Sequence, residues 1–158
     1  MFRKMSRPKQ LLSQEECLDL LKQEPRGVLS VLGDDDYPYG LPLDFFYAPE
    51  DGKLYFHCGK TGHKLDALRR HDKASFCVMD KGYHKEGDWA LTINSVIVFG
   101  RVEIIEDRER VVELTRRLSY KYIQDEAYIE DEISRFAPAT LVLALTPEHI
   151  CGKRVHES

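Results

Sequence analysis

The sequence lacks long apolar runs and closely spaced cysteines. No stretch approaches the roughly 20 apolar residues that a membrane-spanning helix needs. The basic start at residues 1–5 leads into polar residues rather than the apolar segment of a secretory signal. The four cysteines lie 19 or more residues apart without a C-x-x-C pair, which excludes a zinc finger or a dense disulfide framework. We therefore expect a cytoplasmic protein with reduced thiols and no membrane contact.

Several diagnostic motifs are also missing. The chain has no complete P-loop pattern, no G-x-G-x-x-G dinucleotide fingerprint and no G-x-S-x-G nucleophile elbow. Its net charge is −4, whereas domains that neutralise many nucleic-acid phosphates are usually basic over a whole face. These absences argue against a P-loop enzyme, a serine hydrolase and a nucleic-acid binder.

What the chain does contain fits a single domain over residues 1–158. With 42% hydrophobic and 32% charged residues, its composition is that of an ordinary globular protein. A chain of this length can bury roughly two-thirds of its unfolded surface, so it needs no metal or disulfide to fold. Residues 57–73 differ from the acidic remainder because they hold five lysines and arginines against two acids. This segment, the basic island, indicates a small anionic ligand.

Apolar alternation and turn signals predict a mainly β chain. Six strands are predicted, over residues 28–32, 37–47, 53–58, 74–79, 90–105 and 141–145, with a bulge or bend at Gly100. Helices are predicted after the capping box that begins at Ser13, and over residues 64–70, 107–122 and 128–136. We expect the first three strands to pair in sequence order. This pattern favours a closed antiparallel barrel with peripheral helices over a parallel doubly wound sheet.

The sharpest local feature is the segment 56–65, where a strand ends and a helix begins. Gly59 and Gly62 allow close approach of the backbone, and His63 and Lys64 fall in the first turn of the helix. Unpaired N–H groups, the helix dipole and the lysine charge together favour a phosphate there. A plain loop with solvated basic residues is the competing interpretation, and the motif alone does not decide between the two.

Other chemistry is less well supported by this segment. His57, Cys58 and His63 could hold a metal, but no carboxylate joins them at helical spacing, so no metal site is expected. Cys58 could act as a nucleophile beside His57, but neighbouring side chains on a strand point to opposite faces. The aromatic residues within 39–56 fit core packing better than a stacking platform, and the acid-rich helices within 107–135 fit solvated faces.

Four segments in this order resemble the pyridoxamine 5'-phosphate oxidase-like flavoproteins, the FMN-binding split-barrel group, and most closely their nitroimidazole-resistance branch. They are Y-G-L-P-L-D-F at 39–45, D-G-K-L-Y-F-H from Asp51, G-H-K-L-D-A-L from Gly62 and S-V-I-V-F-G-R-V-E from Ser95. The resemblance runs from about residue 13 to 153. It implies a mainly β, six-stranded antiparallel split β-barrel of the FMN-binding type, and a homodimer with FMN at the subunit interface.

The resemblance also implies which residues contact the cofactor. Lys64 corresponds to the family's phosphate-binding lysine, and His63 takes the place of an arginine that often supports the same phosphate. His57 and Cys58 match the segment beside the ribityl chain and the flavin ring. The remaining residues implied at the ring are Leu41, Pro42, Leu43 and Asp44 along one edge, and Asn94 and Ser95 on the pyrimidine side.

The function that this resemblance implies is a flavin-dependent oxidoreductase that reduces a small planar acceptor. That chemistry obliges no side chain to act as acid or base, although His57 or His149 could donate a proton. A flavin or haem binding or sensing module, a pyridoxamine phosphate oxidase-like enzyme and a relative without cofactor stay open. Residues 154–156 have the Arg-x-His spelling of a vitamin-oxidase substrate motif, but only two residues follow them, so we expect no vitamin oxidase activity.

Overall fold

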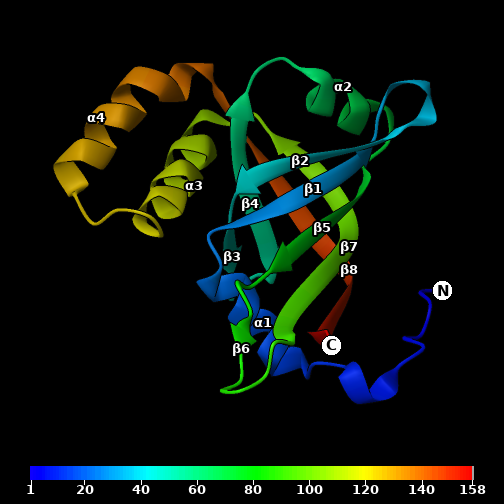
Figure 1. The fold of residues 1–158 in the computed structure, drawn as a ribbon. Coiled ribbons are helices and arrows are strands. Elements are labelled where there is room, and N and C mark those ends of the chain that lie inside the picture. The colour runs from blue at the N-terminus through cyan, green and yellow to red at the C-terminus, as the bar shows by residue number, and fades with distance from the viewer. Residues whose placement is uncertain (158) are drawn as a thin grey trace.

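A computed structural model describes residues 1–157 (Figure 1). One antiparallel sheet curls into a split barrel with helices at its periphery, which confirms the expected fold class. The strands are β1 (Arg26–Leu32), β2 (Pro38–Asp44), β3 (Phe46–Ala48), β4 (Lys53–Gly59), β5 (Lys73–Met79), β6 (Tyr83–His84), β7 (Leu91–Ile105) and β8 (Thr140–Glu157). The six long strands correspond to the six predicted ones. The short β3 is the end of the predicted strand 37–47, and the short β6 was not predicted.

The helices lie around the barrel. They are α1 (Gln14–Gln23), α2 (His63–Arg70), α3 (Arg108–Tyr120) and α4 (Glu126–Phe136), with short 3-10 turns at Pro8–Gln10, Asp34–Asp36 and Ala137–Ala139. The capping box of α1 is confirmed, because Ser13 Oγ accepts from the amide of Glu16 at 3.1 Å and Glu16 Oε2 accepts from the amide of Ser13 at 2.8 Å. Asp107 caps α3 in the same way, accepting from the amide of Arg110 at 2.9 Å.

The order of strands in the sheet explains why the barrel is split. The order is β2-β1-β5-β7-β8-β4-β3, with β6 paired to β7. The strands at the two ends of this order, β2 and β3, are consecutive in the chain and are separated only by Phe45. The sheet therefore curls until its two edges meet at Phe45, and the split lies at that junction.

The expectation of one continuous strand over 37–47 was wrong, because the strand is interrupted at Phe45. Residues of β2 pair with β1, whereas β3 pairs with β4, so β4 does not join β2 in the expected three-stranded meander. The side chain of Phe45 is fully buried. Its backbone N–H and C=O bind the side chains of Tyr122 and Lys121 instead of a neighbouring strand. The chain can therefore change edges here without leaving buried polar groups unpaired.

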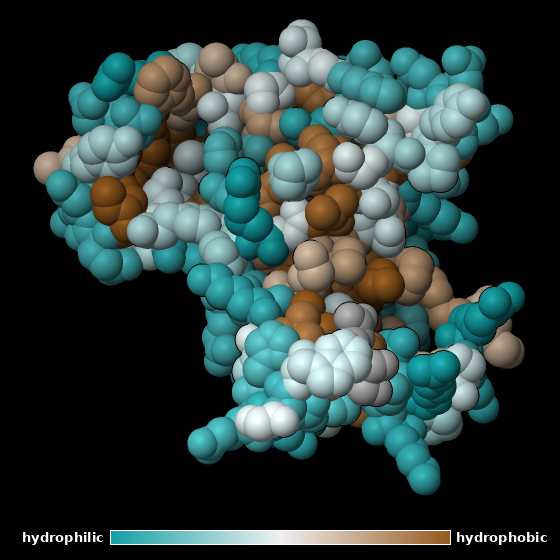
Figure 2. Space-filling model, viewed as in Figure 1, coloured by the Kyte–Doolittle hydropathy of each residue, from teal (hydrophilic) through white to brown (hydrophobic). Residues whose placement is uncertain are grey.

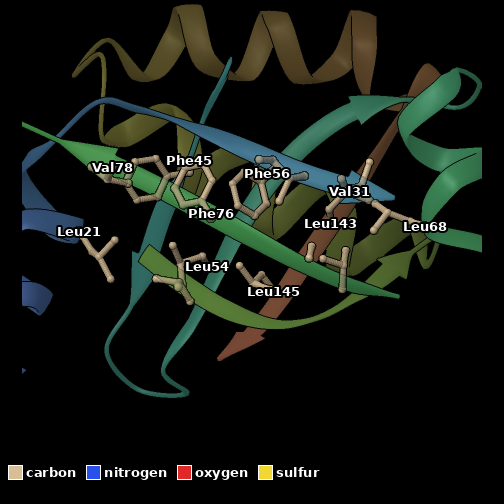
Figure 3. Close-up of a cluster of buried hydrophobic side chains, with 14 of the residues drawn as sticks. Leu21, Val31, Phe45, Leu54, Phe56, Leu68, Phe76, Val78, Leu143 and Leu145 are labelled. Atoms are coloured by element: carbon tan, nitrogen blue, oxygen red, sulfur yellow. The ribbon is translucent and has the colours of Figure 1, made fainter. Parts of the chain in front are cut away.

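Aromatic residues form the centre of the core (Figure 3). The ring of Phe76 on β5 lies edge-on to Phe45 at 4.7 Å and to Phe56 of β4 at 4.9 Å between ring centroids. Leu21 of α1 and Leu68 of α2 join the same cluster. The two helices lie toward opposite ends of the barrel in Figure 1, so each closes one end of the core.

The last strand is much longer than the predicted 141–145. β8 continues to residue 157 and pairs with β7 from Val142 onward, with a register shift between Phe99 and Gly100. The predicted irregularity at Gly100 is confirmed, since a Cβ there would lie 2.1 Å from the carbonyl oxygen of Thr146. The polar residues at 146–149 interrupt the apolar alternation, which is why the sequence pattern ends at 145.

Candidate functional site

The start of α2 presents unpaired donors next to a free lysine. Gly62 precedes the helix with φ of 135°, a conformation that favours glycine, and no side chain caps this helix end. The amides of His63 and Lys64 lie in the first turn, where intrahelical bonds cannot reach them. Among residues 1–157, the ion pairs of this helix involve other side chains and leave the Lys64 ammonium group free. This geometry suits an anion.

His63 is held against the turn between β1 and β2. Its ring stacks on Tyr39 at 4.2 Å between ring centroids, and its Nε2 accepts a hydrogen bond from the amide of Asp34 at 3.1 Å. The Asp34 carboxylate also pairs with Arg70 at 2.7 Å. The acidic turn therefore engages His63 and Arg70 of the basic island, and among the described residues it leaves Lys64 at the helix start without an ion-pair partner. The role of His63 at a phosphate stays a prediction.

The end of β4 places His57 and Cys58 on opposite faces, as strand alternation predicts. Cys58 lies in the core, where burial raises the pKa of its thiol, so only its backbone could reach a ligand on the other face. His57 is open to solvent, but the protein atoms around its ring still disfavour the charged form. Burial lowers the pKa of His57; Asp44 opposes this effect and Lys64 adds to it.

The predicted contact strand, 41–44, forms the free edge of the sheet. Leu41 and Leu43 pack against the core, whereas Pro42 is exposed. Because β2 pairs with β1 alone, the backbone groups on its other side face no strand among the described residues, and a proline is tolerated there. Asp44 ends the strand and pairs with Arg26 at 2.7 Å. A flat ligand could align along this edge and bind its backbone.

A cleft of about 310 Å³ lies beside this edge, between the sheet and the α3–α4 hairpin. The sheet contributes Asp44, His57 and Thr140, and the residues from the hairpin and the turn after it are Thr115, Leu118, Ser119, Tyr122, Ile123, Glu132, Ile133, Phe136 and Ala137. The Oγ1 atom of Thr115 is buried without a hydrogen-bond partner in the described structure. The wall is mostly apolar and has no lysine or arginine. A small, largely uncharged ring system suits it.

The helical wall of this cleft was not predicted from the sequence. The acid-rich helices were expected to present solvated faces, which holds for much of α4, where only Ile129 and Ile133 are buried. The side chains of Tyr122 and Ile123 are 41% and 37% exposed, directly after α3. The sequence signal for this wall was the apolar pair Tyr122 and Ile123 at the end of a predicted helix. The sequence does not show which part of the protein this pair faces.

Asn94 and Ser95 lie at the opposite end of the barrel from Lys64. Ile105 of β7 is level with His57, because both pair with Val142 of β8. Asn94 precedes Ile105 by 11 residues, which corresponds to roughly 36 Å along an extended strand. One chain therefore does not bring Asn94 and Ser95 to the cleft, and their role at a flavin stays a prediction.

The side chain of Asn94 is already occupied within its own chain. Its Nδ2 donates to Asp80 at 2.8 Å, and its Oδ1 accepts from Arg154 Nε at 2.9 Å. Arg154 also pairs with Glu16 of α1 at 2.9 Å. Arg154 of the Arg-x-His segment therefore connects β8 to β7 through Asn94 and to α1 through Glu16. Ser95, in contrast, lines a hollow beneath residues 1–6.

The second candidate proton donor, His149, also lies away from the cleft. It pairs in register with Phe99 and its ring stacks on Phe2 at 4.7 Å between ring centroids. It follows Val142, the partner of His57, by seven residues along β8, or roughly 23 Å. Of the two histidines, only His57 reaches the cleft in one chain.

Two further findings concern residues 1–157 alone. No helix among them is long and apolar enough to cross a membrane. They also contain no group of three or more histidine, cysteine, aspartate or glutamate side chains arranged to hold a metal ion.

Comparison with solved structures finds the same fold in several proteins. A candidate 5-nitroimidazole antibiotic resistance protein from Bacteroides thetaiotaomicron is 19% identical, with a TM-score of 0.80 over 93% of this chain and 87% of the other. An FAD-binding protein from Mesorhizobium loti is 22% identical, with a TM-score of 0.64 over 92% and 96% of the two chains. An FAD-binding protein from Mycobacterium smegmatis is 19% identical, with a TM-score of 0.64 over 94% and 99%.

Sequence comparison gives the family. No curated protein matches the chain, but the family model for pyridoxamine 5'-phosphate oxidase matches residues 13–154. The matched range includes the whole split barrel up to Arg154, the free lysine of α2 and the cleft beside β2. The chain belongs to the pyridoxamine 5'-phosphate oxidase family.

Proposed function

We propose that this protein binds FMN at the start of α2 and passes electrons to a small planar acceptor in the cleft beneath α3 and α4. The observation that carries the proposal is the free Lys64 ammonium group beside unpaired helix amides, close to His57 and the cleft. The FAD-binding relatives support a flavin as the ligand. The charge of the phosphate would offset the cost of a lysine at a helix N-terminus.

The residues of this chain would each have a separate task. Lys64 and the amides of α2 would hold the phosphate, and the free edge of β2 would align the ring. FMN would supply hydride or single-electron transfer when bound. His57, whose pKa burial lowers, is neutral at pH 7 and carries one N–H that it can donate into the cleft.

The composition of the cleft favours a planar acceptor over a phosphorylated vitamin. Its charged lining residues other than histidine are the acids Asp44 and Glu132. A phosphate on the substrate would meet these carboxylates without a cation in the wall to balance them. The resistance protein from Bacteroides has the same fold, which is consistent with a nitroaromatic acceptor. We expect no useful oxidation of pyridoxamine phosphate.

A second copy of the chain would complete the site. Val28, Cys77, Ile97 and Cys151 lie in one row across four strands on the outer face of the sheet. Val28, Ile97 and the nearby Met79 are 41%, 38% and 63% exposed. Figure 2 shows apolar surface across the middle of the molecule, over β1 and β5. Residues 1–6 lie over the part of this face around Ile97 and Cys151, since they line one hollow with both. The exposed apolar side chains of Val28 and Met79 beside it suit a dimer contact.

Ligand binding to matched variants tests the phosphate site. Lys64→Ala should weaken FMN binding about tenfold or more, since a lost charge-assisted hydrogen bond costs on the order of 1.5–3 kcal/mol. Riboflavin, which lacks the phosphate, should bind both proteins equally. Lys60→Ala, in the loop that precedes α2, is the matched control. Equal loss of FMN and riboflavin would show that Lys64 is structural.

Redox assays separate turnover from storage. NADH or NADPH should reduce the bound flavin, and a nitroaromatic or quinone should reoxidise it. If no donor reduces the flavin, the protein is a binding module. Sedimentation should show a dimer at micromolar concentration, and its thermal stability should rise with both FMN and protein concentration. A monomer that still binds FMN would remove the dimer from the proposal.

A further inference from the structure

The turn between β1 and β2 carries three consecutive acids and rests on the start of α2. All three residues of this acidic turn, Asp34–Asp36, are exposed. Asp34 donates its backbone N–H to Nε2 of His63 at 3.1 Å, and its carboxylate pairs with Arg70 at 2.7 Å. A Cβ on Gly33 would lie 3.0 Å from the same Nε2 atom, so the turn lies in direct contact with the first residue of α2.

The acidic turn keeps a net negative charge. Among residues 1–157 its ion pairs involve only Asp34, so Asp35 and Asp36 have no cationic partner. His63 adds no positive charge in this arrangement, since its Nε2 accepts the hydrogen bond from Asp34. Asp35 and Asp36 have positive φ angles of 53° and 60°, which aspartate and asparagine adopt more readily than most residues. Two uncompensated carboxylates are therefore held beside the helix that would bind the phosphate.

β2 connects the acidic turn to the cleft, with the start of α2 between them. Asp44, at the end of β2, lines the cleft, whereas Tyr39, near its beginning, stacks on His63. The strand from Tyr39 to Asp44 spans roughly 17 Å, enough for a tricyclic ring and a five-carbon chain laid end to end. In Figure 1 the acidic turn and α2 lie on the same side of the barrel, away from α3 and α4. A flavin with its ring at the cleft and its phosphate at α2 therefore points its far end toward the acidic turn.

We propose that the acidic turn sets the cofactor specificity of this site by excluding flavins that carry a second phosphate, as FAD does. This inference rests on the proposed FMN site and deepens it, because it assigns a discriminating element beyond the phosphate that Lys64 would bind. FMN ends at that phosphate and leaves the turn solvated. In FAD the second phosphate would lie next to the carboxylates of Asp35 and Asp36, and like charges at such distances repel.

Removal of the two uncompensated charges, with the turn left intact, tests the proposal. Asparagine tolerates positive φ, so Asp35→Asn/Asp36→Asn should keep the turn conformation and the contacts of Asp34. Flavin fluorescence titrations in 0.01 M salt should show that the wild-type protein binds FMN more tightly than FAD. In the double variant FAD should bind about fivefold more tightly, as expected for two exposed charges at about 8 Å. The affinity for FMN should change less, and that for riboflavin should not change.

Salt and a matched variant separate this charge effect from other causes. The gain in FAD affinity should shrink at 1 M salt, because the screening length falls from about 30 Å at 0.01 M to about 3 Å. Glu15→Gln/Asp19→Asn removes two exposed acids from α1, at the opposite end of the barrel from α2. This control changes the net charge equally and should leave the preference for FMN unchanged.

Other results would overturn the inference but leave the proposed function intact. These are equal wild-type affinities for FMN and FAD, no gain in FAD affinity in the double variant, and the same gain in the α1 control. An equal gain for all three flavins would show that the turn acts on the fold of the site, and a gain that persists at 1 M salt would show that shape rather than charge discriminates. A wild-type protein that binds none of the three flavins would refute the proposed function itself.

Discussion

The hydroxyl of Tyr122 accepts a hydrogen bond from the backbone amide of Phe45 at 2.9 Å. The same oxygen lies 2.5 Å from the carbonyl oxygen of Pro25 and 3.0 Å from that of Phe45, to either of which it can donate. Lys121 Nζ donates to the carbonyl of Phe45 at 2.9 Å. The residue at which the barrel splits therefore has both backbone groups bound by the end of α3, which also lines the cleft.

Removal of the Tyr122 hydroxyl should destabilise the split. Tyr122→Phe leaves the part-buried amide of Phe45 without a partner, and such a loss costs roughly 1–3 kcal/mol. Denaturant unfolding should show a lower midpoint with an unchanged dependence on denaturant concentration. Tyr128→Phe, at an exposed tyrosine of α4, is the control. Equal stability of the two variants would mean that water replaces the hydroxyl at no cost.

Lys121 should make stability depend on pH. Burial lowers the pKa of Lys121 to about 8 in the folded chain, whereas an unfolded lysine has a pKa of about 10.4. Between these values the unfolded chain binds more protons, so the free energy of unfolding should rise with pH. The increase should disappear in Lys121→Met. Unfolding curves from pH 7 to 9.5 test this, with Lys60→Met as the baseline.

Above pH 10 the ionisation of Tyr122 should lower the free energy of unfolding again. Burial raises the pKa of Tyr122 to about 12, above the value of about 10 for an unfolded tyrosine. Above pH 10 the unfolded chain loses the phenolic proton first, so this group lowers stability as pH rises further. A monotonic fall in stability from pH 7 would contradict the assignment to Lys121.

His57 should report the occupancy of the phosphate site. Burial is the main reason that its pKa is low, and the charge of Lys64 adds to the effect. A phosphate bound at Lys64 would neutralise that charge, so the pKa of His57 should rise when FMN or inorganic phosphate is added. NMR titration of the imidazole protons measures it. In Lys64→Ala the pKa should already be higher and should not respond to phosphate.

Gly100 should tolerate no side chain. A Cβ at this position would lie 2.1 Å from the carbonyl oxygen of Thr146 and 3.0 Å from Leu145 Cδ1. Gly100→Ala must therefore push β7 from β8 at the bulge, at a cost of about 1–3 kcal/mol. Gly59→Ala, where nothing lies within 4 Å, should change stability much less. Thermal unfolding of the two variants makes the comparison.

Features governed by neighbouring residues could be predicted from the sequence. The box from Ser13 to Glu16 starts α1 because its two hydrogen bonds join residues three apart. Asp107 caps α3 for the same reason. The strand alternation placed His57 and Cys58 on opposite faces, and the start of α2 combined its glycine and lysine within three residues. Each of these features needs no distant contact.

Features that depend on distant contacts could not be predicted in this way. The break at Phe45 depends on Tyr122, 77 residues later, and His63 is drawn to the Asp34 turn by contacts that span 29 residues. The continuation of β8 past residue 145 needs β7 beside it, because its polar residues have no apolar pattern of their own.

The sequence by itself determined the approximate positions of the six long strands, the caps, the basic island and the resemblance to a flavoprotein family, because periodicity, capping and charge are properties of adjacent residues. Only the tertiary structure decided that the barrel splits at Phe45, that α3 and α4 form a cleft beside His57, and that Asn94 lies far from Lys64 in one chain. Those relationships depend on how the sheet curls, since curling sets which of its residues meet. The strand pattern predicted that the sheet closes, but it does not say which residues meet where it closes.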